Sequence, residues 1–129
     1  MPAYVTSAQP VGILRDIIVA LVRRDGPDLT ARQLGVFLTV YLRNGPHTVR
    51  GLAKDLNVAK PVITRALDRL GEFDFARRKR EPQDRRSIVV QRTAKGAALL
   101  REMRAIIGEA AAAAEERATA PAVAPQAWR

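Results

Sequence analysis

The sequence predicts a mainly α-helical fold with a small β-hairpin, which places it in the α+β class. Two short amphipathic segments meet at Asn57-Val58, as is typical of two helices joined by a tight turn. A basic segment at 77–80, a turn at 81–84 and an apolar segment at 87–90 follow them, as expected for a hairpin. Apolar residues at helical spacing near both ends of the chain predict two further, flanking helices.

The positive charge of the chain is concentrated near the predicted hairpin. The 129 residues have a formal net charge of +9. Residues 77–92 hold seven Arg or Lys and two acidic residues, so this short segment alone has a net charge of +5. Such a distribution favours a nucleic-acid partner and, less specifically, an anionic membrane surface.

The composition excludes several kinds of site. The chain has no cysteine, which rules out disulfides, thiolate zinc sites and thiol redox chemistry. His47 is the only histidine, which rules out a His-rich metal site. We interpret His47 as an ordinary loop residue, the alternative being a contact to an effector or a phosphate. There is no nucleophile–base pair and no Gly-rich phosphate loop, so no catalytic residue, metal or cofactor is predicted.

The sequence also bears on location. No apolar run approaches the length of a membrane span. The first ten residues lack the basic and apolar regions of a secretory signal. We therefore expect a cytoplasmic protein without a membrane partner.

The first helix is predicted to begin at Pro10, after a flexible N-terminus at 1–9, and to end at Gly26-Pro27. Its apolar residues form two neighbouring stripes, which need more cover than a chain of this size easily supplies. We therefore expect a subunit interface over 10–26, the alternative being an internal core helix. The interface residues predicted on this helix are Ile13, Leu14, Ile17, Ile18 and Leu21.

The second helix is predicted to begin after Thr30, because Thr30 and Gln33 have the spacing of a capping box. Asn44-Gly45-Pro46 ends it, and a short extended piece follows at 46–47. The inner stripe predicted for this helix is Leu34, Phe37, Leu38, Tyr41 and Leu42.

A helix-turn-helix is predicted next. Thr48 can cap a third helix, and Asn57 tolerates the left-handed conformation that ends it. A fourth helix is expected from about Ala59 to Leu70, and the second helix of such a pair can lie in the major groove of DNA. Its buried stripe is predicted to be Ile63, Ala66, Leu67 and Leu70.

A hairpin directly after that helix is predicted to form a wing. Phe73 and Phe75 are expected to begin its first strand with their side chains inward, and residues 87–90 to form the returning strand. At the tip, we expect the carboxylate of Asp84 to hold an arginine extended by an ion pair, a shape that suits a narrow minor groove. The alternative is a solvated hairpin with surface charges.

The last helix is predicted to begin after Thr93 and to run to residue 118. Its apolar stripe makes it the second candidate for the subunit interface. Residues 119–129 contain two prolines and no apolar pattern, so a disordered tail is expected. The interface residues predicted on this helix are Leu100, Met103 and Ile107.

These residues resemble the multiple antibiotic resistance regulator (MarR) family of winged helix-turn-helix transcription regulators. The matching segments are LTARQLGVFLTVY, TVRGLAKDLNVAKPVITRALDRL and EPQDRRSIVVQRTAKGAALL, which together cover roughly residues 29–100. The order is specific: a helix-turn-helix, a D-x-R wing tip, a strand, and then T-x-x-G opening a helix.

The resemblance implies one domain over 10–118, with a DNA-binding lobe at 29–93 and dimerisation helices at 10–26 and 94–118. It implies a homodimer that regulates transcription, usually as a repressor, at a pseudo-palindromic operator in double-stranded DNA. Many relatives also bind a small aromatic effector between the dimer region and the lobe.

The predicted DNA-binding residues fall into three groups. By their positions in the family pattern, one group enters the major groove and one the minor groove, with Asp84 orienting Arg86. The third group contacts phosphates. They are Lys60, Pro61, Val62, Thr64 and Arg65 for the major groove, Asp84, Arg85 and Arg86 for the minor groove, and Thr48, Arg50, Arg69, Arg78 and Lys79 for phosphates.

Four features depart from the family pattern. Ala59 stands where Ser is usual, which removes a helix cap worth about 1 kcal/mol. Asp74 stands where a glycine usually turns the chain into the wing, and Arg92 replaces a Leu that normally packs. Both end regions are also short. These departures concern the link into the wing, the dimer geometry and the effector pocket.

Three other function classes compete with a DNA-binding regulator. The foremost is a winged-helix protein-interaction module, an adaptor or antirepressor, that presents the hairpin to a protein partner without specific DNA binding. RNA binding is disfavoured because only three Phe, two Tyr and one Trp are available for stacking on bases. An enzyme is disfavoured by the lack of catalytic groups.

Overall fold

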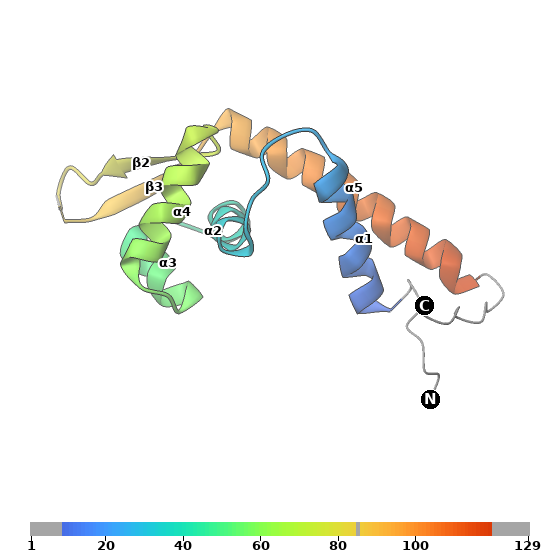
Figure 1. The fold of residues 1–129 in the computed structure, drawn as a ribbon. Coiled ribbons are helices and arrows are strands. Elements are labelled where there is room, and N and C mark those ends of the chain that lie inside the picture. The colour runs from blue at the N-terminus through green and yellow to red at the C-terminus, as the bar shows by residue number, and fades with distance from the viewer. Residues whose placement is uncertain (1–8, 85, 120–129) are drawn as a thin grey trace. The chain divides into compact units, whose positions relative to one another are not determined.

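The computed structural model describes residues 9–84 and 86–119 and confirms a mainly helical fold with a small antiparallel sheet (Figure 1). The chain divides into two compact units, one of residues 27–102 and one formed by the two ends. The described elements are α1 (Pro10–Arg23), α2 (Ala31–Leu42), β1 (His47–Thr48), α3 (Val49–Leu56), α4 (Lys60–Glu72), β2 (Ala76–Arg80), β3 (Ile88–Arg92) and α5 (Ala94–Thr119).

The core of the central unit forms where α2, α3 and α4 pack together. Leu52 of α3 and Phe37 of α2 are almost completely buried, and the stripe predicted for α4 is confirmed as buried. Burial of each large apolar side chain contributes about 1.5–3 kcal/mol. The most buried side chains are Phe37, Leu52, Ile63, Leu70, Val36 and Val40.

The helix ends agree with the local signals in the sequence. The capping box of α2 is confirmed: the Gln33 N–H donates to the Thr30 hydroxyl over 3.2 Å, and the Thr30 N–H donates to the Gln33 side chain over 2.9 Å. The Thr48 hydroxyl accepts a hydrogen bond from Gly51 N, and Asn57 is left-handed with φ 54°. Ala59 leaves α4 without a side-chain cap.

The sheet has one strand more than the predicted hairpin. Its order is β1-β3-β2, all antiparallel. The extended piece predicted at 46–47 is displaced by one residue and pairs with β3, with His47 opposite Val90 and Thr48 opposite Val89. The start of α3 is thereby fixed beside the base of the wing.

The link from α4 into the wing differs from the prediction. Helix α4 continues to Glu72, and Phe73 and Phe75 lie in the turn before β2, so their prediction as strand residues was wrong. The turn forms because Asp74 adopts φ 58° and the Phe75 N–H donates to Leu70 O. Phe75 is nevertheless buried as predicted, with its ring edge against Phe37.

The terminal unit contains α1 and the later part of α5. Arg117 of α5 forms an ion pair with Asp16 of α1. Helix α5 includes Thr119, which was predicted to belong to the tail. The rest of the predicted tail and residues 1–8 of the predicted flexible N-terminus lie outside the described residues. Within the described part of the chain, no helix is both long and apolar enough to cross a membrane.

Candidate nucleic-acid interface

Helix α4 presents the predicted major-groove residues on its outer side. Lys60, Pro61 and Arg65 are exposed, whereas Val62 and Thr64 are half-buried. Arg65 Nε donates to Pro61 O over 3.3 Å, which keeps the start of this side chain close to its own helix. The opposite side of α4 is buried, so the outer side is available to a partner.

A hollow separates the outer side of α4 from the wing. It measures about 490 Å³ and brings together six of the predicted site residues. The cations of Arg50, Lys60 and Arg86 outnumber the single carboxylate, Asp84, so the hollow is electropositive. Val49, Ser87 and Ile88 also line it and were not among the predicted site residues, although Ser87 belongs to the wing at 81–87 that was predicted to read the minor groove. The predicted residues in the hollow are Thr48, Arg50, Lys60, Thr64, Asp84 and Arg86.

Asp84 shapes the wing tip through the backbone of Arg86, and the predicted ion pair with an arginine of the tip stays a prediction, since Arg85 lies outside the described residues. An Asp84 carboxylate oxygen accepts a hydrogen bond from the backbone N–H of Arg86 over 3.1 Å, rather than from the Arg86 guanidinium. An aspartate reaches the N–H two residues ahead more readily than a long, solvated side chain. Ser87 N donates to Asp84 O, and Glu81 N donates to Ser87 O, which closes the turn.

Two arginines predicted to contact phosphates are paired with acids of α4. Arg69 lies 2.9 Å from Glu72, and its guanidinium lies 4.5 Å from the centre of the Phe73 ring. Arg78 of β2 pairs with Asp68. These acids lie within reach because helix spacing and strand alternation direct the arginines towards them. Lys79, also predicted as a phosphate contact, is exposed.

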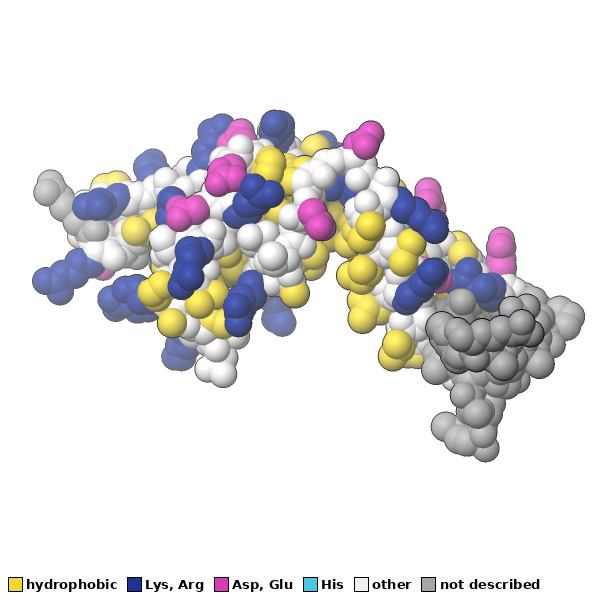
Figure 2. All heavy atoms as spheres, viewed as in Figure 1, with side chains coloured by type: hydrophobic (Ala, Val, Ile, Leu, Met, Phe, Trp, Pro, Cys, Tyr) yellow, Lys and Arg dark blue, Asp and Glu magenta, His cyan; other side chains and the backbone are white. Residues whose placement is uncertain are grey.

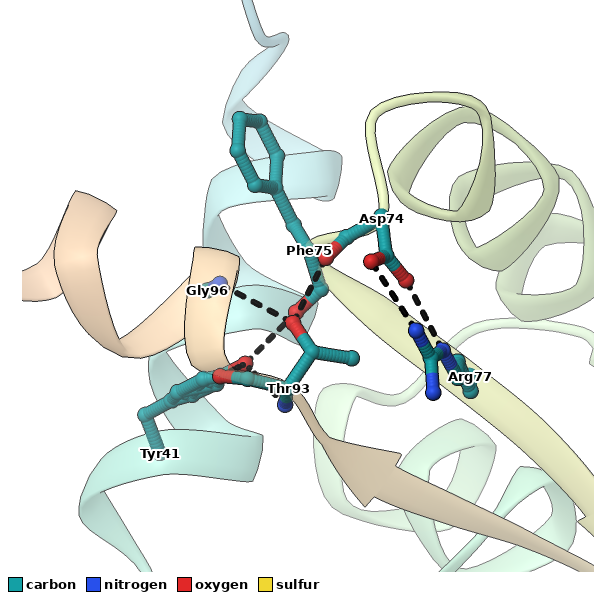
Figure 3. Close-up of polar contacts among 6 residues, drawn as sticks. All are labelled: Tyr41, Asp74, Phe75, Arg77, Thr93 and Gly96. Carbon is teal, nitrogen blue, oxygen red and sulfur yellow. Dashed lines mark hydrogen bonds and ion pairs between the residues drawn. The ribbon is translucent and has the colours of Figure 1, made fainter.

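A hydrogen-bonded junction holds the base of the wing against α2 and α5 (Figure 3). The Tyr41 hydroxyl donates to Phe75 O over 2.6 Å and accepts from Thr93 N over 3.0 Å. The Thr93 hydroxyl donates to Asp74 O over 2.6 Å and accepts from Gly96 N over 2.9 Å. Thr93 is thus confirmed as the cap of α5, while the role of the Tyr41 hydroxyl was missed because Tyr41 was taken only as an apolar core residue.

Asp74 and Arg92, which depart from the family pattern, each form hydrogen bonds near this junction. The Asp74 carboxylate accepts two hydrogen bonds from Arg77, over 2.8 and 3.0 Å, and this contact lowers the pKa of Asp74 (Figure 3). Arg92 donates to Val40 O over 2.8 Å and to Arg43 O over 3.1 Å. It therefore satisfies carbonyls at the end of α2, where a cation is favourable.

Charge and apolar surface gather in different places. In the view of Figure 2, Lys and Arg side chains cluster over α3, α4 and the wing, while hydrophobic side chains gather over α1. Within the described residues, no three His, Asp or Glu side chains come together in a way that could hold a metal ion.

A helix-turn-helix followed by a basic hairpin against its second helix defines a winged helix-turn-helix protein. Residues 29–88 match the model of the MarR family. They therefore form a MarR-family domain, and the proteins of this family are transcription regulators rather than enzymes.

Three solved structures illustrate the similarity. A MarR transcriptional regulator from Methanosarcina mazei Go1 is 28% identical, with a TM-score of 0.56 over 64% of this chain and 58% of its own, so the chain matches less than two thirds of its length. The transcriptional repressor CouR, bound to a 23-mer DNA duplex, is 26% identical, with a TM-score of 0.66 over 84% of this chain and 72% of CouR. A mutant of MarR from E. coli, complexed with operator DNA, is 26% identical, with a TM-score of 0.59 over 75% of this chain and 64% of its own. No curated protein matches the chain.

Proposed function

We propose that this chain is a sequence-specific DNA-binding regulator, and a repressor, that reads the major groove with α4 and the minor groove with the wing. The observation that carries the proposal is the electropositive hollow in which Lys60, Thr64 and Arg86 face one space. Two of the similar proteins, CouR and E. coli MarR, have been solved with DNA, which supports the same partner here.

The proposed reading of bases depends on the outer side of α4. Helix α4 has 13 residues, and an α-helix with its side chains is about 10–12 Å across, which fits a major groove about 12 Å wide. Arg65 can donate two hydrogen bonds to one guanine, and the Thr64 hydroxyl and Val62 can contact neighbouring base edges. Arg86 at the wing would enter the adjacent minor groove, where a cation is favoured by the negative potential.

We propose that a second copy of the chain covers the apolar side of α1. Leu14 and Ile18 are 56% and 45% exposed, and the neighbouring Val11 and Val22 are each 70% exposed. Of the other predicted interface residues, Ile107 is exposed and Met103 is buried within its own chain, while Ile13, Ile17, Leu21 and Leu100 are half-buried.

A symmetric dimer would place two α4 helices on the two halves of a pseudo-palindromic operator. A small aromatic effector and a cytoplasmic location stay predictions.

Fluorescence anisotropy of a labelled duplex at several salt concentrations tests the proposal. The duplex is first selected by the protein from a random library. Each phosphate neutralised contributes about 0.9 to the log–log slope of affinity against salt. Arg86→Ala should weaken binding and lower this slope, while Arg65→Ala should also relax base preference. Arg104→Ala is the matched control, because it removes the same charge from an exposed part of α5 outside the predicted contacts.

Two outcomes would overturn the proposal. Unchanged affinity in both Arg65→Ala and Arg86→Ala would reject α4 and the wing as the reading elements. Recovery of one stoichiometric protein partner, with no salt-sensitive DNA binding, would instead identify a protein-interaction module.

A further inference from the structure

An acidic residue interrupts the side of α4 that faces the wing. Lys60, Thr64 and Asp68 follow one another at four-residue spacing, so they lie along one flank of the helix. Asp68 is exposed and lies about 6 Å beyond Thr64 along the helix axis. A carboxylate so close to the proposed DNA surface would repel phosphates unless a cation neutralises it.

Strand alternation explains why Arg78 is that cation. Alternate residues of β2 point to opposite faces of the sheet, so Arg78 leaves from the same face as Ala76. Ala76 is buried, as is Val90, which lies opposite Arg78 in the sheet. Arg78 therefore leaves from the inner face of the wing, which packs against α4, whereas the adjacent Lys79 leaves from the outer face.

Arg78 and Asp68 meet as an ion pair that joins α4 to β2, the first strand of the wing. Their side chains keep 37% and 53% of their exposure, so the pair stands at the surface between the two proposed reading elements. Helix α4 and strand β2 are also connected by the chain itself, through the turn at Asp74. This turn lies on the side of the ion pair away from the wing tip. The ion pair thus restrains the hinge between α4 and the hairpin at a second point.

We infer that Arg78 and Asp68 are positioning residues for DNA recognition rather than contacts to DNA. The pair holds the wing at a fixed distance from α4, so that the two elements meet successive grooves without first being ordered by the DNA. Restraint before binding lowers the ordering cost of association. This inference rests on the proposed function and assigns Arg78 a different role from the phosphate contact that its charge suggests.

The direction in which Asp68→Asn changes the affinity for DNA distinguishes a phosphate contact from a positioning role. If Arg78 were a phosphate contact, Asp68→Asn would release it, tighten binding and steepen the salt slope by about 0.9. If the pair positions the wing, Asp68→Asn weakens binding about three- to fivefold and leaves the slope unchanged, although it makes the protein more positive. This range corresponds to an exposed ion pair of ordinary strength.

A double-mutant cycle completes the binding test. Asp68→Asn and the double variant should bind equally weakly, because each removes the same restraint. Arg78→Gln should bind more weakly still, because it also leaves the Asp68 carboxylate without its cation. Lys79→Gln is the matched control from the other face of the strand, and it should lower the salt slope by about 0.9. Tighter binding by Asp68→Asn, or a salt slope about 0.9 lower in the double variant than in Asp68→Asn, would overturn the inference.

A distance measurement tests the restraint without DNA. Because the chain has no cysteine, Arg65→Cys and Gln83→Cys would be the only sites for spin labels, one on α4 and one on the wing. Pulsed electron resonance should give a narrow distance distribution in the otherwise native chain and a broader one after Asp68→Asn. An unchanged width would overturn the inference. If the native chain failed to bind DNA, the proposed function would fall, while the measured width would still decide whether the pair restrains the wing.

Discussion

Gly96 is the position where one added methyl group should damage the central unit most. A Cβ built on Gly96 would lie 1.7 Å from the Tyr41 hydroxyl oxygen and 2.3 Å from Phe75 O, far inside van der Waals contact. The Tyr41 ring cannot withdraw without breaking the hydrogen bonds that its hydroxyl makes to Phe75 O and Thr93 N (Figure 3). Gly96→Ala must therefore displace either Tyr41 or the start of α5.

The expected cost follows from these contacts. The two hydrogen bonds of the Tyr41 hydroxyl contribute about 1 kcal/mol each, and overpacking adds about 1–3 kcal/mol, so Gly96→Ala should lower the free energy of unfolding by about 3–5 kcal/mol. Tyr41→Phe should not rescue the variant fully, because Phe75 O still obstructs the new methyl group. Such a loss is a large part of the stability of an ordinary domain.

Gly108→Ala is the matched control on the same helix. A Cβ at Gly108 has no neighbour within 4 Å, and alanine is favoured over glycine inside a helix by about 1 kcal/mol. Urea unfolding followed by circular dichroism would compare both variants with the native chain. A Gly96→Ala variant within about 1 kcal/mol of the native stability, on the scale of that control, would refute the proposed close packing.

Three further predictions concern the two unusual residues and the dimer face. Asp74→Asn keeps a residue that tolerates positive φ but loses the ion pair with Arg77. The contact with Arg77 lowers the pKa of Asp74 in the native chain. The ion pair therefore stabilises the native chain above about pH 4, the ordinary carboxyl pKa, and this stabilisation is lost as the pH falls through the lowered pKa of Asp74. The difference in urea midpoint between the native chain and Asp74→Asn should therefore disappear in acid, and a constant difference would contradict this. Arg92→Leu should cost about 1 kcal/mol in thermal unfolding, since two carbonyls at the end of α2 lose a donor, and a stabilised variant would contradict this. Leu14→Asp with Ile18→Asp should convert a dimer to a monomer in light scattering without loss of helix content, whereas an unchanged dimer mass would place the interface elsewhere.

The sequence predicted the features that depend on neighbouring residues. The capping box at Thr30, the left-handed Asn57 and the buried stripe of α4 all follow from spacings of a few residues, and all three are confirmed. The extended piece at 46–47 was predicted, but its place as a strand of the sheet was not, because two residues are too few to show an alternating pattern. Strand β1 is defined by its pairing with Val89 and Val90.

Contacts between distant residues could not be predicted from local patterns. The Tyr41 hydroxyl meets Thr93, 52 residues later, and no spacing rule connects them. The partner of Arg78 depends on which face of β2 lies over α4, and this is known only once the hairpin is placed. The resemblance to relatives marked Asp74 and Arg92 as unusual, but only the structure shows that one keeps the positive φ of the turn and the other satisfies the end of α2.

The central claim is tested most directly by selecting DNA from a fully random duplex library. The native chain and Arg65→Ala are used in parallel. If α4 reads the major groove of a pseudo-palindromic operator, the native chain will enrich an inverted repeat with half-sites about 10 base pairs apart or a multiple of it. Arg65→Ala will then lose preference at one symmetric pair of positions and keep it elsewhere. Enrichment of no sequence by the native chain, or an identical motif from both proteins, would contradict the assignment of α4 and Arg65 to base recognition.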